Sequence, residues 1–113
     1  MNVIRTNIEN LSKKDLYKLT KASGVNVKDA PVDEPVGVAA YALYTDVNSK
    51  GVESEVLAIL CEDGRKLHTI SATFKESFFD VVDIMEDESF SIVIKKATSK
   101  AGREFVSCEL YCD

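Results

Sequence analysis

The sequence of residues 36–61 is VGVAAYALYTDVNSKGVESEVLAILC, and it predicts two long β-strands joined by a turn. The first strand covers residues 36–47, where β-branched and aromatic residues are frequent and apolar residues fall on both faces. Residues 48–51, NSKG, are typical of a turn. The second strand, residues 52–61, ends in the run VLAILC. This run is apolar on both faces, which indicates a central position in a sheet.

The chain beyond residue 61 predicts one helix and three more strands. Asp63-Gly64 is a strong signal for a hairpin turn. Thr73 and Glu76 match a capping box, and the apolar residues after them recur at the spacing of an amphipathic helix. The expected elements are a strand at 65–71, a helix from 73 to the acidic residues 86–88, and strands at 89–98 and 103–112 around a turn at 99–102.

The first 30 residues predict a helical extension. Ser12 is a good N-cap, and apolar residues follow it at helical spacing, so we expect a helix over residues 12–23. Residues 25–35 contain two prolines and predict an extended connector. A short strand is also expected near residues 3–8. We therefore divide the chain into an extension, residues 1–30, and one OB-like domain, residues 31–113.

The order strand, strand, strand, helix, strand, strand predicts a mainly β fold. It is the order of the oligonucleotide/oligosaccharide-binding (OB) fold, a five-stranded, partly open barrel, here with an extra N-terminal helix. The helix between the third and fourth strands would close one end of the barrel with its apolar face. A small α+β domain with the same elements in an open sheet is the alternative, because periodicity does not distinguish a closed sheet from an open one.

The composition is that of one soluble domain, and its charge is unevenly distributed. The chain has 113 residues, 45% of them hydrophobic, and a net charge of −5. Residues 1–30 carry six Lys/Arg against three Asp/Glu, residues 31–94 four against thirteen, and residues 95–113 four against three, which gives +3, −9 and +1. A negative total is unusual for a nucleic-acid-binding protein, but local potential matters more than the sum.

The OB interpretation predicts where a ligand would bind. Such folds bind oligomers on the second and third strands, between the loops that join strands one to two and four to five. In this chain the two loops are residues 48–51 and 99–102. Most of the cations after residue 30 lie in or near these loops or at the start of the third strand. They are Lys50, Arg65, Lys66, Lys95, Lys96, Lys100 and Arg103.

Aromatic side chains are the other requirement for binding single strands, because bases stack on them. Tyr44 is the first candidate, since it lies late in the first strand and close to the first loop; the alternative is a half-buried core tyrosine. Phe105 and Tyr111 share one face of the last strand with polar residues, although they could also pack under the N-terminal helix. His68, the single histidine, could stack on a base or could be an incidental surface residue.

Signals for catalysis, metals and cofactors are weak. One histidine supports neither a Ser-His-Asp triad nor a paired-histidine metal site, and the five glycines are isolated, unlike those of a phosphate-binding loop. We expect no cofactor, no metal and no enzymatic activity. The three cysteines are expected to be small core residues in a reducing cytoplasm. The sequence has no apolar run of membrane-spanning length and no signal-peptide pattern.

Four stretches also share their order and spacing with a known family. They are Ala39-Ala-Tyr-Ala-Leu-Tyr-Thr-Asp-Val47, Glu62-Asp-Gly64 with Ile70-Ser-Ala-Thr73, Phe79-Asp-Val-Val-Asp-Ile84, and Thr98-Ser-Lys-Ala-Gly-Arg-Glu-Phe105. Across about two thirds of its length the chain resembles the small single-stranded DNA-binding proteins of phages that infect low-GC Gram-positive bacteria, including the protein-primed Bacillus phages.

The resemblance implies an OB-like protein that coats single-stranded replication intermediates without catalysis. Tyrosines are thought to contact DNA in that family, and Tyr44 matches a family tyrosine. Leu67 stands where the family pattern can place another tyrosine, so one stacking position is missing here, and the adjacent His68 is a candidate replacement. The first 30 residues do not match the family pattern.

Two functions from different classes follow from this reading. The first is binding of single-stranded DNA, largely independent of sequence, by a monomer or small homo-oligomer in the cytoplasm of a bacterial host, with replication proteins as further partners and no membrane contact. The alternative is an OB-like protein-interaction module, such as a phage assembly or replication adaptor that does not bind DNA. Convergence of the basic side chains on one groove would favour the first.

Overall fold

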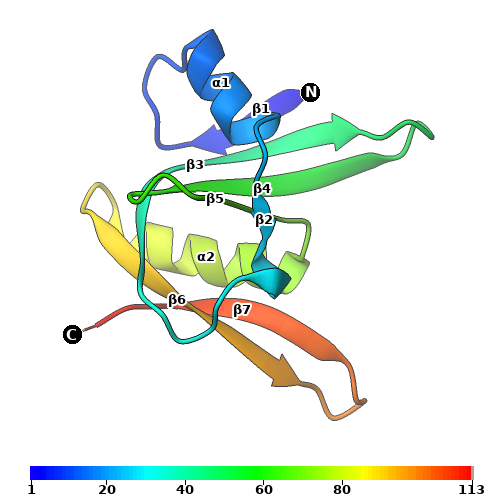
Figure 1. The fold of residues 1–113 in the computed structure, drawn as a ribbon, viewed down its shortest axis with the longest axis vertical. Coiled ribbons are helices and arrows are strands. Elements are labelled where there is room, and N and C mark those ends of the chain that lie inside the picture. Colours follow the sequence, from blue (N-terminus) through cyan, green and yellow to red (C-terminus); the bar gives the residue numbers. More distant parts are fainter. Residues whose placement is uncertain (113) are drawn as a thin grey trace.

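The computed structural model describes residues 1–112, which form one curled sheet with two α-helices and a 3-10 helix (Figure 1). The elements are β1 (Asn2–Thr6), α1 (Lys13–Thr20), β2 (Val25–Asn26), η1 (Val27–Asp29), β3 (Val36–Val47), β4 (Glu53–Cys61), β5 (Lys66–Thr69), α2 (Ala72–Met85), β6 (Phe90–Thr98) and β7 (Glu104–Leu110).

The sheet is a half-barrel whose strand order is β2-β5-β4-β3-β6-β7, with β1 added to β3. β3 pairs with β6 at residues 36–38 and with β4 at residues 38–47, and the register shifts between Val38 and Ala40. Because β3 passes from one partner to the other along its length, the sheet curls around α2 (Figure 1). β5 with β2 forms one end of the strand order and β7 the other, so the barrel is open between β5 and β7.

The expected order of strands and helix is present from β3 to β7, and the arrangement is consistent with an OB-like fold. The sheet has seven strands, two more than the five predicted for the barrel. One of the two is β1, near the short strand expected at residues 3–8, and the other is β2, which the sequence did not predict. β1 pairs antiparallel with β3, and β2 pairs parallel with β5. The connector expected at residues 25–35 thus contains a short strand and η1.

The start of α2 differs from the predicted capping box. The N-cap is Ser71, whose hydroxyl accepts a hydrogen bond from the backbone N–H of Phe74 at 3.2 Å. Thr73 was expected in this role, but it already lies inside the helix. The reason is that β5 ends at Thr69, so the chain turns into the helix two residues earlier than the sequence pattern suggested.

The core lies between the concave side of the sheet and α2. Phe74, Phe78, Val81 and Val82 of α2 are buried there, as the apolar stripe of the helix predicts. Tyr41 and Phe78 meet edge to face with ring centroids 5.4 Å apart, a geometry that aromatic rings prefer. Most of the fold's apolar burial is therefore inside the half-barrel.

A second apolar cluster lies on the outer face of the sheet, beneath α1. It contains Leu19, Ala42, Tyr44 and Ala58. Leu19 is only 1% exposed, and Ser12 caps the helix by accepting a hydrogen bond from the N–H of Asp15 at 3.1 Å. These contacts hold α1 against the outer face of β3 and β4.

Replacing Leu19 by Ala tests how firmly this second cluster holds α1. We expect Leu19→Ala to lower the free energy of unfolding by about 2–5 kcal/mol, because it removes a fully buried side chain and leaves a cavity. The measurement is urea denaturation followed by circular dichroism. Ile84→Ala is the matched control, since Ile84 is 75% exposed and its loss should change stability by less than about 0.5 kcal/mol. Equal effects of the two substitutions would contradict the packing described above.

The cysteines differ in exposure and therefore in predicted reactivity. Cys61 and Cys108 are buried as expected, and burial raises the pKa of each thiol to about 11. Cys112 was also expected in the core, but it follows the end of β7 and is exposed.

The exposure of Cys112 predicts selective labelling. At about pH 8 we expect a thiol reagent to modify one cysteine rapidly in the folded protein and all three after denaturation, because the thiolate is the reacting form. Peptide mass mapping should identify Cys112; rapid labelling of Cys61 or Cys108 would refute this.

Candidate nucleic-acid interface

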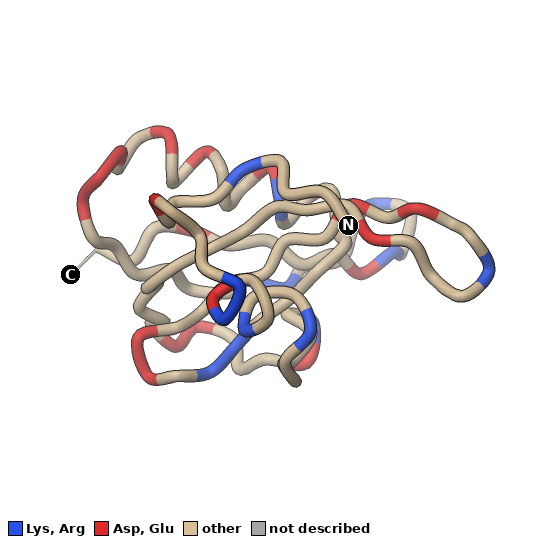
Figure 2. Tube along the Cα trace, turned by 90° about the horizontal axis from the view of Figure 1, so that it is seen from above, with Lys and Arg blue, Asp and Glu red and all other residues tan. Residues whose placement is uncertain are grey.

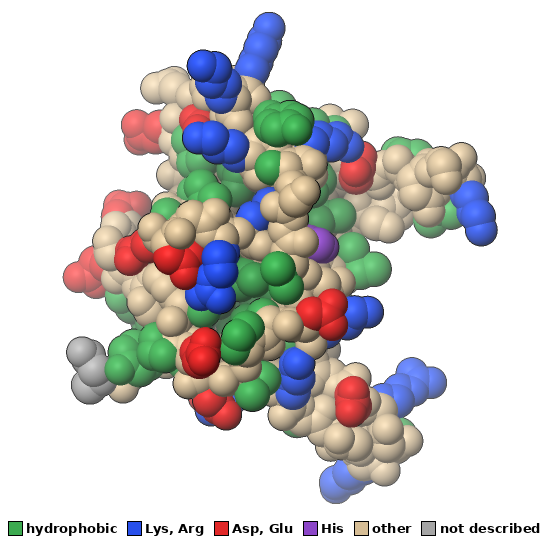
Figure 3. All heavy atoms as spheres, in the orientation of Figure 1, with side chains coloured by type: hydrophobic (Ala, Val, Ile, Leu, Met, Phe, Trp, Pro, Cys, Tyr) green, Lys and Arg blue, Asp and Glu red, His purple; other side chains and the backbone are tan. Residues whose placement is uncertain are grey.

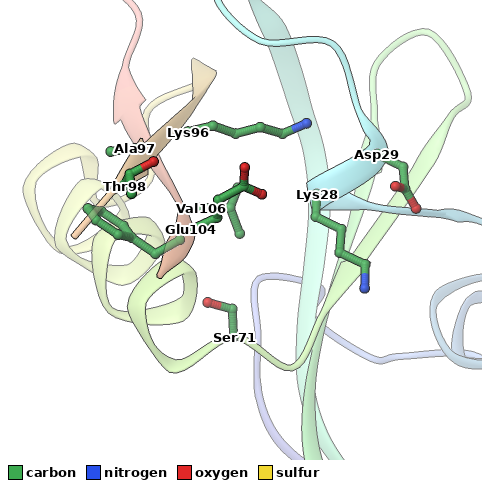
Figure 4. A pocket seen from close by; sticks show the side chains of 9 residues that line it. Lys28, Asp29, Ser71, Lys96, Ala97, Thr98, Glu104 and Val106 are labelled. Atoms are coloured by element: carbon green, nitrogen blue, oxygen red, sulfur yellow. The ribbon is translucent and has the colours of Figure 1, made fainter. Parts of the chain in front are cut away.

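A groove of about 550 Å³ lies at the open side of the half-barrel, and we call it the open-edge groove. It runs between η1 and the start of α2 on one side and the paired ends of β6 and β7 on the other. Figure 4 shows Lys28 and Lys96 on its two sides with the Glu104 carboxylate between them. Its lining residues are Lys28, Asp29, Ser71, Lys96, Ala97, Thr98, Glu104, Phe105 and Val106.

Strand alternation determines which lysine of β6 reaches this groove. Ile92 and Ile94 point into the core and are buried, and Lys96 is the next residue on the same face, where β6 extends past the core. Lys95 lies on the opposite face and forms an ion pair with Asp33. The hydrogen bond to Asp33 raises the pKa of Lys95. Of the two predicted lysines, the structure brings Lys96 into the groove and holds Lys95 on the other side of the strand.

Phe105 is the predicted aromatic residue that the structure brings to the rim of the groove; strand alternation places its side chain on the face of Lys95, opposite to Lys96. Its side chain is 39% exposed, and its backbone pairs with Ala97 on β6. The β6–β7 turn just beyond carries Lys100 and Arg103, which are both exposed. A cation and an aromatic face thus stand together at one end of the β6–β7 hairpin, the combination that binding of single strands requires.

Lys50 occupies the tip of a second hairpin that projects from the same side of the molecule (Figures 1 and 3). The turn is fixed by Asn48, whose side-chain oxygen accepts hydrogen bonds from the N–H groups of Lys50 at 2.8 Å and Val52 at 3.0 Å. Figure 2 shows a basic position at the tip and acidic positions along the arms. Those acidic residues include Glu53 and Glu55, so the positive charge of this hairpin is confined to its tip.

Two predicted site residues lie elsewhere. Arg65 is in the β4–β5 turn, at the opposite end of β4 from the β3–β4 hairpin. It forms an ion pair with Asp63 at 2.7 Å. Tyr111 follows β7 at the end opposite to Phe105, and its N–H donates a hydrogen bond to the carbonyl of Ser91. The structure therefore separates Arg65 and Tyr111 from the open-edge groove.

Tyr44 and Lys66 lie under the N-terminal segment. Tyr44 is 4% exposed, and its hydroxyl donates a hydrogen bond to the carbonyl of Thr20 at 3.3 Å. Lys66 is also buried and donates to the carbonyl of Ala22 at 2.8 Å. Burial, then the nearby Lys21, lowers the pKa of Lys66. With α1 in this position the Tyr44 ring is closed to a base, and a role for it in DNA binding stays a prediction.

His68 shares the outer face of β5 with Lys66 but is only half-buried. Burial and then the charge of Lys66 lower the pKa of His68 below its usual value of 6.5. The imidazole is therefore neutral at pH 7, so His68 could offer a stacking surface but not a cation.

Lys28 is the groove cation that the sequence did not predict, and the acidic residues Asp29 and Glu104 of the lining were not predicted either. Lys28 lies in η1, which begins where the side chain of Asn26 accepts a hydrogen bond from the N–H of Lys28 at 3.1 Å. An asparagine whose side chain bonds to the backbone two residues on is a signal for such a turn, but the two prolines of this segment predict an extended connector. Only the pairing of β2 with β5 places η1 beside the groove.

Residues 1–112 contain no group of three or more His, Cys, Asp or Glu side chains that could hold a metal ion. No helix within these residues is long and apolar enough to cross a membrane.

Comparison with known proteins shows which family this sequence belongs to. The chain is 30% identical over 92 residues to the single-stranded DNA-binding protein of Bacillus phage B103, a match that covers 76% of this chain and 75% of that protein. It is 28% identical over 88 residues to the proteins of the same name from Bacillus phages PZA and phi29, covering 75% of this chain and 71% of each relative. No solved structure matches. The family model described as "Phage Single-stranded DNA-binding protein" matches residues 4–111, so it also covers most of the first 30 residues, which were expected not to match, and the chain therefore belongs to that family.

Proposed function

We propose that this protein binds single-stranded DNA through the open-edge groove and the two hairpins beside it. The observation that carries the proposal is the groove itself, where Lys28 and Lys96 lie on two sides at the open side of the half-barrel and Phe105 lies at the rim, on the opposite face of the β6–β7 hairpin from Lys96. The cations would hold phosphates, and Phe105 would stack on a base, with Lys50, Lys100 and Arg103 extending the contact along the hairpins. Membership of the phage family supports the choice of single-stranded DNA as the ligand.

The proposed binding is largely independent of base sequence. The groove and the two hairpins offer exposed cations and one aromatic face, and such groups recognise backbone charge and stacking area. The groove lining also carries the acidic residues Asp29 and Glu104. Through it the protein would coat single-stranded intermediates of phage DNA replication in the cytoplasm of the bacterial host. It would act without catalysis, as a monomer or small homo-oligomer, and beside the replication proteins that use the same strands.

Salt dependence is the first test of this proposal. Binding of labelled oligo(dT), followed by fluorescence anisotropy, should weaken as salt rises from about 50 to about 200 mM, because each phosphate contact releases counterions. Four to six contacts would give a slope of log K against log salt of about −3 to −4. Absence of binding at the lower salt would overturn the proposal in favour of the protein-interaction module.

Phe105→Ala tests where the DNA binds. We expect it to weaken binding about 5- to 140-fold, because loss of one stacked base costs about 1–3 kcal/mol. Phe105→Tyr should retain most of the affinity, since the ring is kept. Tyr111→Ala is the matched control, because Tyr111 is similarly exposed but lies at the other end of β7. If Tyr111→Ala weakens binding and Phe105→Ala does not, the groove assignment is wrong.

A further inference from the structure

The outward face of α1 is a cationic surface that the open-edge groove does not include. Successive residues of an α-helix are about 100° apart, so four lysines and a tyrosine fall within an arc of about 140°. All five are exposed, and Figure 3 shows Lys and Arg side chains gathered at the top of the view, where Figure 1 places α1. The α1 outer face consists of Lys13, Lys14, Tyr17, Lys18 and Lys21.

Helix stability does not explain this composition. Lys14 and Lys18 are four residues apart, and like charges at that spacing destabilise a helix. Lys21 pairs with Asp46 at 3.3 Å, but within residues 1–112 the other three lysines of this face have no ion-pair partner. Tyr17 is 62% exposed and so contributes little to packing. A charged face with an exposed ring at its centre is the arrangement that binds a single strand.

The position of this face is fixed before any ligand arrives. Leu19 on the opposite side of α1 is fully buried, and the carbonyl of Thr20 accepts the hydrogen bond from Tyr44. The helix also begins at a side-chain cap, Ser12. Because these contacts hold the helix on the sheet, the outer lysines keep a constant placement relative to the rest of the molecule.

The chain itself links this face to the open-edge groove. From α1 it continues through β2, which pairs with β5, into η1, where Lys28 lines the groove. Residues 13–28 contain five lysines and one acidic residue, Asp15. The neighbouring surface of β5 presents the neutral His68, and Ile70 just beyond it is exposed. A strand leaving the groove in this direction would therefore meet cations and apolar surface.

We infer that the α1 outer face is a second contact surface for single-stranded DNA, which extends the path beyond the groove. Lys13, Lys14 and Lys18 hold phosphates, and Tyr17 stacks on a base. The inference rests on the proposed function, because it adds a segment to the same DNA path. It predicts that the α1 outer face contributes to binding affinity only for DNA strands long enough to reach it.

The test combines oligonucleotide length with a triple substitution in the full-length protein. The probes are oligo(dT) of about 6 and about 30 nucleotides. OB folds cover about 4–16 nucleotides, so the short probe is near the lower limit of that range and the long probe exceeds its upper limit. We expect Lys13→Ala/Lys14→Ala/Lys18→Ala to leave binding of the short probe unchanged. For the long probe, the slope of log K against log salt should become less negative by about 2, because three phosphate contacts are lost at about 0.7 each.

A charge-preserving triple variant is the matched control. Lys13→Arg/Lys14→Arg/Lys18→Arg should keep the wild-type slope with the long probe. If wild type binds both probes and the alanine triple variant has the same affinity and slope for the long one, the inference is wrong and the groove proposal stands. A wild-type protein that binds neither probe would overturn the proposed function itself.

Tyr17 provides an independent readout, because the chain contains no tryptophan and tyrosine emission can be followed directly. With the long probe, Tyr17→Phe should preserve affinity but reduce the quenching of tyrosine emission, whereas Tyr17→Ala should reduce both. With the short probe neither variant should differ from wild type in affinity. Unchanged quenching in Tyr17→Phe would remove Tyr17 from the DNA path.

Discussion

The backbone of β3 is shared among three other strands, and this pairing controls the rest of the structure. Residues 36–38 bond to β6, residues 38–47 bond to β4, and residues 42–45 also bond to β1. β4 occupies one edge of β3, so β6 and β1 pair with the other edge, each at a different position along the strand. The register shift at Val38–Ala40 marks the point where the sheet bends. The half-barrel, and therefore its open side, follows from this bend.

The open side then determines where a ligand can bind. In a closed barrel β5 would pair with β7, and the backbone hydrogen-bonding groups of both strand edges would have partners. Here the edge of β7 instead faces η1 across a groove. The groove is lined by the ends of β6 and β7, which extend past the core. Along one face of such a strand, the side chains are therefore apolar where they pack in the core and polar where they reach the groove. Ile94 is fully buried, and Lys96 on the same face lines the groove. The core and the site are thus successive parts of the same strand.

The order of the main elements could be predicted from sequence because it depends on local patterns. The strand pattern of residues 36–61 and the apolar stripe of residues 74–85 both include residues that pack in the core of the half-barrel, and the other apolar face of residues 36–61 packs under α1. The state of Tyr44 could not be predicted, since the pattern assigns it to a face but does not say what covers that face. The cover is α1, which is more than twenty residues away in sequence. Lys95 and Lys96 show the same limit of sequence-based prediction. Strand alternation places their side chains on opposite faces, but only the fold shows that Asp33 lies on the face of Lys95 and the groove on the face of Lys96.

The net charge of −5 is compatible with an anionic ligand because the charges are spatially separated. The acidic residues 86–88 lie just before β6, whereas Lys96 is near its far end. Eight residues of extended strand span about 26 Å, which is more than two screening lengths of about 10 Å at about 0.1 M salt. A strand in the groove would therefore experience the lining charges at short range, Lys28 and Lys96 against Asp29 and Glu104, and little of the acidic end. At about 0.01 M salt the screening length grows to about 30 Å, and the acidic end would then act across the molecule. The acidic end, which acts little on the groove near physiological salt, would oppose binding in dilute buffer, so the net charge of −5 becomes relevant only when screening is removed.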